Sequence, residues 1–63
     1  MKAEEYYLKA IEKDPDFAYP YYGLGSIYDD QKDYTKAEKY YHKAIEKDPN
    51  YAYSYNGLGI IYS

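Results

Sequence analysis

Apolar residues recur along the chain with the spacing of one helical face. In residues 36–47 they occupy positions i, i+3, i+4, i+7 and i+8, while lysine and glutamate fill the opposite side. This stripe consists of Ala37, Tyr40, Tyr41, Ala44 and Ile45. A period of about 3.6 residues with one apolar side is typical of an α-helix that packs by that side against a neighbour.

The same stripe occurs near the start of the chain, and related segments lie between and after the two copies. In residues 2–13 it consists of Ala3, Tyr6, Tyr7, Ala10 and Ile11. In residues 18–31 helical spacing returns at Ala18, Tyr21, Leu24, Gly25 and Tyr28. Pro20 falls in the first turn of this segment, where a missing N–H costs little, so it indicates a helix start.

The pattern predicts four helices, at about residues 2–13, 18–31, 35–47 and 52–62. Thr35, followed three residues later by Glu38, matches a capping box at the start of the third helix. At the far end of that helix Asp48 precedes Pro49, which disfavours helical geometry at Asp48. Met1 stands where Thr35 stands in the later copy, so we expect the first helix to lack this cap.

Residues 2–29 are repeated as residues 36–63. After a shift of 34 positions, 20 of the 28 aligned residues are identical. A repeat of this length is typical of stacked architectures, in which each unit buries its apolar face against the next. The sequence therefore predicts a regular stack of short helical hairpins.

The repeat carries a specific motif, Tyr21-x2-Leu24-Gly25-x2-Tyr28, then Ala37-x3-Tyr41, then Pro49. With tyrosine in place of the usual tryptophan and phenylalanine, this motif resembles the signature of the tetratricopeptide repeat. The resemblance covers nearly the whole chain and implies an all-α fold of antiparallel helical hairpins stacked as a right-handed α-solenoid. Lys32 departs from the family pattern, because these repeats commonly place a glycine between their two helices, so we expect a turn there that is strained or slightly altered.

The resemblance also implies a division of the chain, since helix A precedes helix B in each tetratricopeptide repeat. Residues 18–51 then form a complete repeat, residues 1–17 a half repeat (helix B) and residues 52–63 a half repeat (helix A). The helices follow the order B, A, B, A, which suggests an excised or engineered segment. In such a segment the outer sides of the first and last helices are uncovered.

These outer sides are the two halves of one hairpin interface, so we expect copies of the chain to bind each other end to end. The expected contact residues are Ala3, Tyr7 and Ala10 in the first helix and Leu58, Gly59 and Tyr62 in the last. A contact between two different surfaces produces an open stack unless its rotation closes a ring or an exchanged dimer. The alternative is that the last helix serves as a cap on a monomer.

Composition narrows the classes of partner. The chain has 13 tyrosines, one phenylalanine and no tryptophan, so its core contains rings whose hydroxyls need water or a partner. A net charge of −3 without an isolated basic cluster argues against nucleic acid as a partner. The apolar runs are too short for a signal peptide or a membrane span, and there is no cysteine, so we expect no membrane association and a cytoplasmic location.

Two sequence features resemble parts of ligand-binding motifs, but a structural role explains each of them better. The GLG sequence of residues 23–25 recurs at 57–59, but it lies inside a helical pattern and lacks the third glycine of a phosphate-binding turn. We interpret it as a site of close helix packing. His42 has no second metal ligand one helical turn away, so we expect it to face solvent.

Catalytic and calcium-binding patterns are also incomplete. Asp29, Asp30 and Asp33 lack the glycine and the final glutamate of a calcium loop, so we interpret them as a polar helix end. A catalytic serine needs a histidine nearby as its base. No histidine stands at a matching position for Ser26, Ser54 or Ser63. We expect no enzyme activity, no cofactor and no metal.

A second hypothesis for the function also follows from the resemblance, because tetratricopeptide arrays bind peptides on a concave face lined by the A helices. The residues that this implies for the groove are Tyr19, Tyr22, Ser26, Asp29, Asp30, Tyr53, Asn56 and Ile60. Family members that capture an acidic carboxylate tail use Lys, Arg and Asn on this face, and Asn56 alone matches that set. A tyrosine-rich, mildly acidic groove favours an apolar or basic peptide instead.

Overall fold

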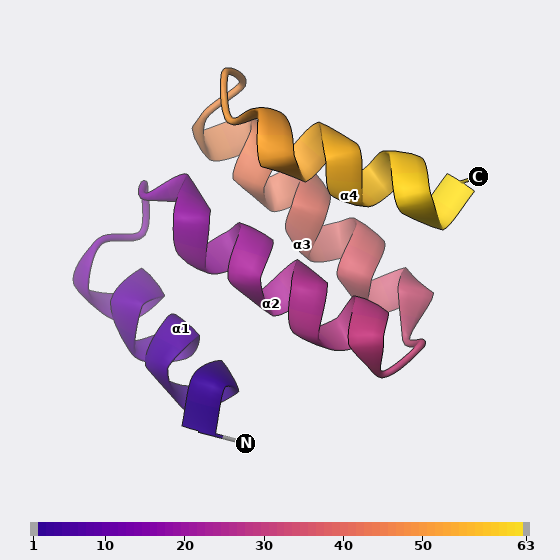
Figure 1. The fold of residues 1–63 in the computed structure, drawn as a ribbon. Coiled ribbons are helices and arrows are strands. Elements are labelled where there is room, and N and C mark those ends of the chain that lie inside the picture. Colours follow the sequence, from indigo (N-terminus) through magenta and orange to yellow (C-terminus); the bar gives the residue numbers. More distant parts are fainter. Residues whose placement is uncertain (1, 63) are drawn as a thin grey trace.

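The computed structural model describes residues 2–62, which form four helices and no strand (Figure 1). Their bounds are α1 Lys2–Lys13, α2 Ala18–Asp30, α3 Tyr34–Lys47 and α4 Ala52–Tyr62. The all-α prediction is confirmed, and each predicted helix boundary agrees to within one residue. The expectations about Met1 and Ser63 fall outside the described residues.

Consecutive helices pack side by side, joined by the short connections 14–17, 31–33 and 48–51. Figure 1 shows α2 and α3 at the centre, with α1 against α2 on one side and α4 against α3 on the other. Helix α2 also contacts α4. The chain therefore forms stacked hairpins, and the two terminal helices lie at opposite ends of the stack.

The core lies where α2, α3 and α4 meet. Leu24, Ala37 and Ala44 are fully buried, and Tyr41 is nearly so. Ala18 and Tyr21 pack with Ala44, and Leu58 packs with Ala37 and Tyr41. The small side chains of α3 allow close approach of the helices, and the tyrosine rings fill the space beside them.

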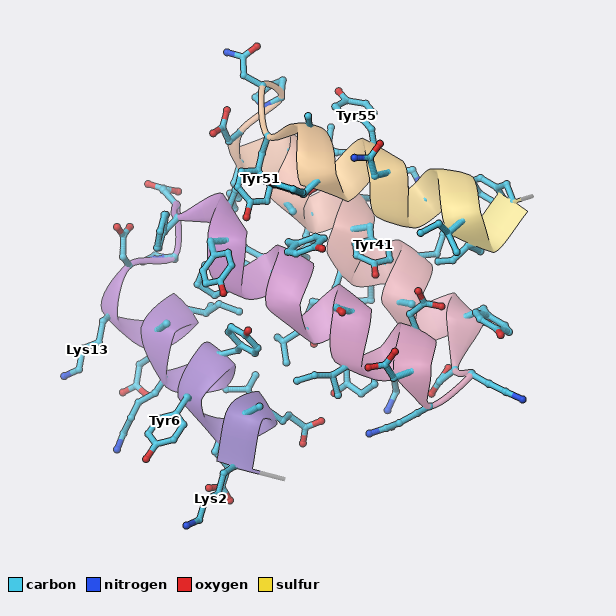
Figure 2. All side chains as sticks on the ribbon, viewed as in Figure 1. Lys2, Tyr6, Lys13, Tyr41, Tyr51 and Tyr55 are labelled. Carbon is cyan, nitrogen blue, oxygen red and sulfur yellow. The ribbon has the colours of Figure 1, made fainter. Side chains whose placement is uncertain are left out.

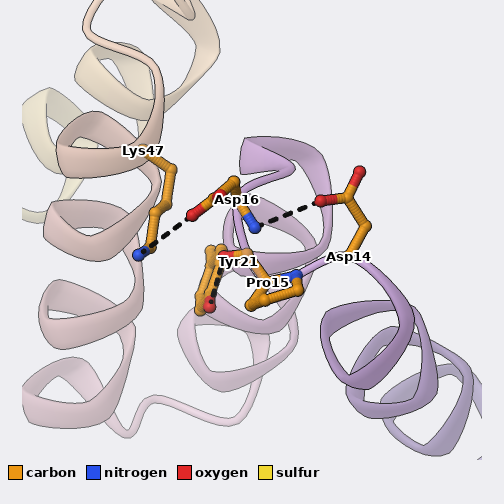
Figure 3. A network of polar contacts seen from close by, with 5 residues as sticks. All are labelled: Asp14, Pro15, Asp16, Tyr21 and Lys47. Carbon is orange, nitrogen blue, oxygen red and sulfur yellow. Dashed lines mark hydrogen bonds and ion pairs between the residues drawn. The ribbon is translucent and has the colours of Figure 1, made fainter.

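Similar polar turns precede helices α2 and α4. Before α2, the Asp16 N–H donates to Asp14 Oδ1 at 3.3 Å, and before α4 the Asn50 N–H donates to Asp48 Oδ1 at 3.0 Å. Such turns suit the residue that precedes a proline in each copy. The Tyr21 hydroxyl also donates to the Pro15 carbonyl at 2.9 Å, which ties the first turn to the body of α2 (Figure 3).

The turn between α2 and α3 corrects one prediction. Helix α3 begins at Tyr34, and its cap is Asp33, whose side chain accepts a hydrogen bond from the Lys36 N–H. The expected capping box of Thr35 and Glu38 is therefore wrong. Lys32 has a φ of 62°, so the expectation of a strained turn at this position is confirmed. Because the chain turns at Lys32, the next residue, Asp33, stands at the cap position of α3.

Candidate functional site

The outer side of α1 is far more exposed than the equivalent side of α3, although the two helices carry the same stripe. Ala37 is fully buried, whereas Ala3, one repeat earlier, is exposed. Tyr40 is half-buried, whereas Tyr6 is 70% exposed. Figure 2 shows Tyr6 projecting away from the other helices. The residues of this surface, called the α1 face below, are Ala3, Tyr6, Tyr7 and Ala10.

Within the α1 face, Tyr7 differs from its neighbours because it also contacts the next helix of its own chain. Its ring packs edge-on against Tyr19, with 5.9 Å between the ring centroids. The ring also lies directly against Gly23, so closely that a methyl group at Gly23 would clash with it. Tyr7 is half-buried as a result, whereas Tyr41, its equivalent in α3, is buried.

The outer side of α4 is exposed in a corresponding way. Tyr55 is 51% exposed, whereas Tyr21, its equivalent in α2, is 7% exposed. Gly59 is exposed, and Tyr62 is 63% exposed. Figure 2 shows Tyr55 projecting away from the rest of the chain. The residues of this surface, called the α4 face below, are Tyr55, Gly59 and Tyr62.

Leu58 does not belong to the α4 face, although the sequence suggested that it would be uncovered. It is 8% exposed and packs against Ala37 and Tyr41 of α3. Leu58 faces α3, while Gly59 and Tyr62 remain exposed. Of the predicted contact residues of α4, those two are accessible at the surface.

Tyrosine rings gather on the side of the molecule where α2 and α4 begin. Tyr22 contacts the rings of Tyr51 and Tyr53, with centroids 5.7 and 6.0 Å away, and Tyr51 contacts Tyr19 at 6.5 Å. We call Tyr19, Tyr22, Tyr51 and Tyr53 the tyrosine surface. Of the residues predicted for a groove it therefore brings together Tyr19, Tyr22 and Tyr53.

The other predicted groove residues lie farther along the same helices. Ser26 and Asp29 are half-buried, and Asp30, Asn56 and Ile60 are exposed. No pocket is hollowed into the described residues, so this side is an open surface. Tyr51 was not predicted as part of it. A signal existed, because Phe17 and Tyr51 place an aromatic ring at the same position before each A-type helix.

Two tyrosine hydroxyls bond to glutamates one helix away. The Tyr28 hydroxyl donates to Glu4 at 2.8 Å, and the Tyr62 hydroxyl donates to Glu38, at positions 34 residues later. The Glu4 carboxylate raises the pKa of Tyr28 to about 12, because it favours the protonated phenol. Burial raises the pKa of Tyr41 to about 12 as well. Both hydroxyls remain protonated at neutral pH, and that of Tyr28 acts as a donor.

Within residues 2–62 no three histidine, cysteine or acidic side chains gather as a metal site would require. His42 is exposed. None of the helices in the described part of the chain is both long and apolar enough to cross a membrane. The features that stand out are thus surfaces, namely the α1 face, the α4 face and the tyrosine surface.

Comparison with known families gave two matches. One family model of the tetratricopeptide repeat matches residues 18–51, and a second model of the same repeat matches residues 40–63. Searches of the curated proteins and of the solved structures gave no match.

Proposed function

The chain belongs to the tetratricopeptide repeat family, whose members are generally protein-interaction or scaffold modules, and we propose that it is a structural repeat module that binds copies of itself. The contact is made end to end, through the α1 face of one copy and the α4 face of another. The function needs no catalytic group.

The observation that carries this proposal is the difference in exposure between equivalent residues of the two copies of the repeat. Tyr21 of α2 and Ala37 of α3 are buried in the central hairpin. Their equivalents in the other copy of the repeat, Tyr55 and Ala3, are exposed. Exposed apolar surface that is covered elsewhere in the same molecule marks an interaction site. The α1 face repeats the covering surface of α3, and the α4 face repeats the covered surface of α2.

The proposal includes the division of the chain into a complete repeat at residues 18–51 with half repeats at 1–17 and 52–63. The match of one family model to residues 18–51 supports this division. The similar turns before α2 and α4 support it too, because the same hydrogen bond recurs at Asp14 and Asp48. Each half repeat then supplies one half of a hairpin interface.

The tyrosine surface supports a second candidate function, the binding of an apolar or basic peptide. Tyr19 is 44% exposed and Tyr53 60% exposed, so the rings offer apolar area together with hydroxyl groups. Asp29 and Asp30 lie on the same helix as Tyr19 and Tyr22, and the chain has a net charge of −3. Acidic groups on the helix that carries these rings favour a basic peptide.

A dilution series followed by sedimentation velocity tests the first proposal. We expect the mean mass of the wild-type chain to rise with concentration, and the Ala3→Glu variant to remain a monomer over the same range. The matched control is Glu5→Gln, an exposed change in the same turn of α1, which should associate as the wild type does. A constant monomer mass for the wild type at the highest concentration reached would refute self-association. A peptide that binds this monomer would support the second candidate.

A further inference from the structure

One tyrosine ring joins the three helices α2, α3 and α4. Tyr41 of α3 lies between Gly25 of α2 and Gly57 of α4. A methyl group at Gly25 would lie 2.7 Å from Cδ1 of this ring, and one at Gly57 would lie 2.6 Å from its Cζ. Both distances are too short for carbon atoms, so the ring needs a glycine on each side. The packing of α3 against α2 and α4 thus places one tyrosine ring between two glycines.

Tyr7 is the equivalent of Tyr41 one repeat earlier. Within residues 2–62 its ring contacts one glycine, where the ring of Tyr41 contacts two. Its ring lies against Gly23, the equivalent of Gly57. Gly59 is the equivalent of Gly25, and a methyl group there would meet no atom within 4 Å. One end of the chain therefore has a ring without its second glycine, and the other end has a glycine without its ring.

A second pair of residues shows the same relation. In the central hairpin Tyr28 stacks on Tyr40 with 5.6 Å between the centroids, and the Lys36 ammonium lies 5.2 Å from the centre of the Tyr28 ring. The equivalents are Tyr62 on the α4 face and Tyr6 on the α1 face, and both are more than 60% exposed. These two pairs are independent, because they involve different residues and different kinds of contact.

We infer the register of the contact between copies. The inference rests on the self-association proposed above: Tyr7 of one copy lies over Gly59 of a second copy, and Tyr6 stacks on Tyr62 of that second copy. Helix α1 then joins α4 of its neighbour as α3 joins α2 within the chain. Because the two faces differ, each copy uses one toward each neighbour, and the stack has a direction.

Two variants each block one face. Gly59→Leu places a side chain where the incoming Tyr7 ring must lie, yet it points into open space within a single copy. Ala3→Glu places a charge on the α1 face at an exposed position. We expect each variant alone to remain a monomer, with association weakened at least tenfold. Asn56→Leu is the matched control for Gly59→Leu, since it adds the same side chain at another exposed position of α4 and should associate normally.

The decisive experiment mixes the two blocked variants in equal amounts. The Gly59→Leu chain keeps its α1 face, and the Ala3→Glu chain keeps its α4 face. We expect the mixture to form a one-to-one dimer that does not grow further with concentration, as measured by sedimentation velocity or by light scattering after size exclusion. Circular dichroism of each variant checks that it is folded, and Tyr6→Glu replaces Ala3→Glu if the latter loses helical content.

The outcomes separate this register from self-association in general. If the wild type associates but either blocked variant still forms dimers alone, two like faces are in contact and the register is wrong. If the wild type associates and the mixture stays monomeric, the register is also wrong, although self-association stands. If the wild type is a monomer throughout, the proposed function fails and the register fails with it.

Discussion

At the scale of single residues, two positions are energetically unfavourable, one because of its backbone conformation and one because of a buried hydroxyl. Lys32 adopts a left-handed conformation, which costs a residue with a Cβ about 1–2 kcal/mol relative to glycine. Ser54 is fully buried, and its Oγ has no hydrogen-bond partner. In the first copy of the repeat Pro20 occupies the equivalent buried position without a polar side chain. Each of the two positions leads to a testable prediction.

Replacing Lys32 by glycine should stabilise the chain by about 1 kcal/mol, because glycine adopts a positive φ without strain. Urea unfolding followed by circular dichroism measures the change. The control is Gln31→Gly, since Gln31 has a φ of −83° and gains nothing from glycine's freedom. Equal effects of the two substitutions would show that the positive φ at Lys32 stores no strain.

Replacing Ser54 by alanine should also stabilise the chain, by about 1 kcal/mol, because it removes a buried hydroxyl without a partner. Alanine favours helices, so part of any gain would come from propensity alone. Asn56→Ala, at an exposed position of the same helix, measures that part. The hydroxyl has no cost if thermal unfolding shows the same gain for both variants.

At the scale of helices, the packing between α2 and α3 depends on small residues in α3. Replacing Ala37 by leucine should destabilise the chain by about 1–3 kcal/mol, because the site is fully buried and has no room for a larger side chain. Ala3→Leu is the matched control, since it makes the same change at the equivalent exposed position of α1. Measured on dilute protein, it should change stability by no more than about 0.5 kcal/mol. Similar losses in the two variants would contradict the packing described for α3.

The helices themselves were predictable because their signals are local. The apolar stripe and the proline after each B-type helix fix the helical segments to within one residue. The cap of α3 was not predictable, because Asp33 and Thr35 are both good capping residues and the positive φ of Lys32 decides between them. The close contact of the Tyr41 ring with Gly25 and Gly57 also needed the structure, since it depends on the relative position of three helices.

The candidate surfaces were predictable in part. The repeat predicted which sides of α1 and α4 would be exposed, since equivalent residues are buried in the central hairpin. It misplaced Leu58, because the helical rotation that turns this side chain inward depends on how α4 packs against α3. It also did not identify the contact between Tyr28 and Glu4, which are 24 residues apart. The recurrence of the same pair as Tyr62 and Glu38 was the available signal.

At the scale of the whole molecule, tyrosine hydroxyls supply much of the polar contact between segments. One ion pair joins separate segments of the described chain, Lys47 with Asp16 at 3.6 Å, and Asp16 is well exposed, so this pair adds little stability (Figure 3). By contrast, the hydroxyls of Tyr21, Tyr28 and Tyr62 each donate a hydrogen bond to another segment. The folded state therefore depends on phenols that stay protonated.

This dependence predicts a loss of stability in alkaline solution. In the folded chain the pKa values of Tyr28 and Tyr41 are raised to about 12, above the ordinary value of 10.0. A raised pKa means that folding favours the protonated phenol, so the contribution to stability is complete below pH 10 and is lost as the pH rises through about 12. We expect the urea midpoint of the wild type to fall across this interval.

Two variants assign the effect to the contact between Tyr28 and Glu4. Tyr28→Phe keeps the ring but removes the titrating hydroxyl, and Glu4→Gln removes the carboxylate that raises the pKa of Tyr28. Both should have a lower midpoint at pH 8 and a shallower fall above pH 10. Glu5→Gln, which changes the same charge at an exposed neighbouring position, should follow the wild type. Because lysines also titrate in this range, the difference between variant and wild type is the quantity that counts. An equal fall in Tyr28→Phe and wild type would mean that this hydroxyl does not couple folding to pH.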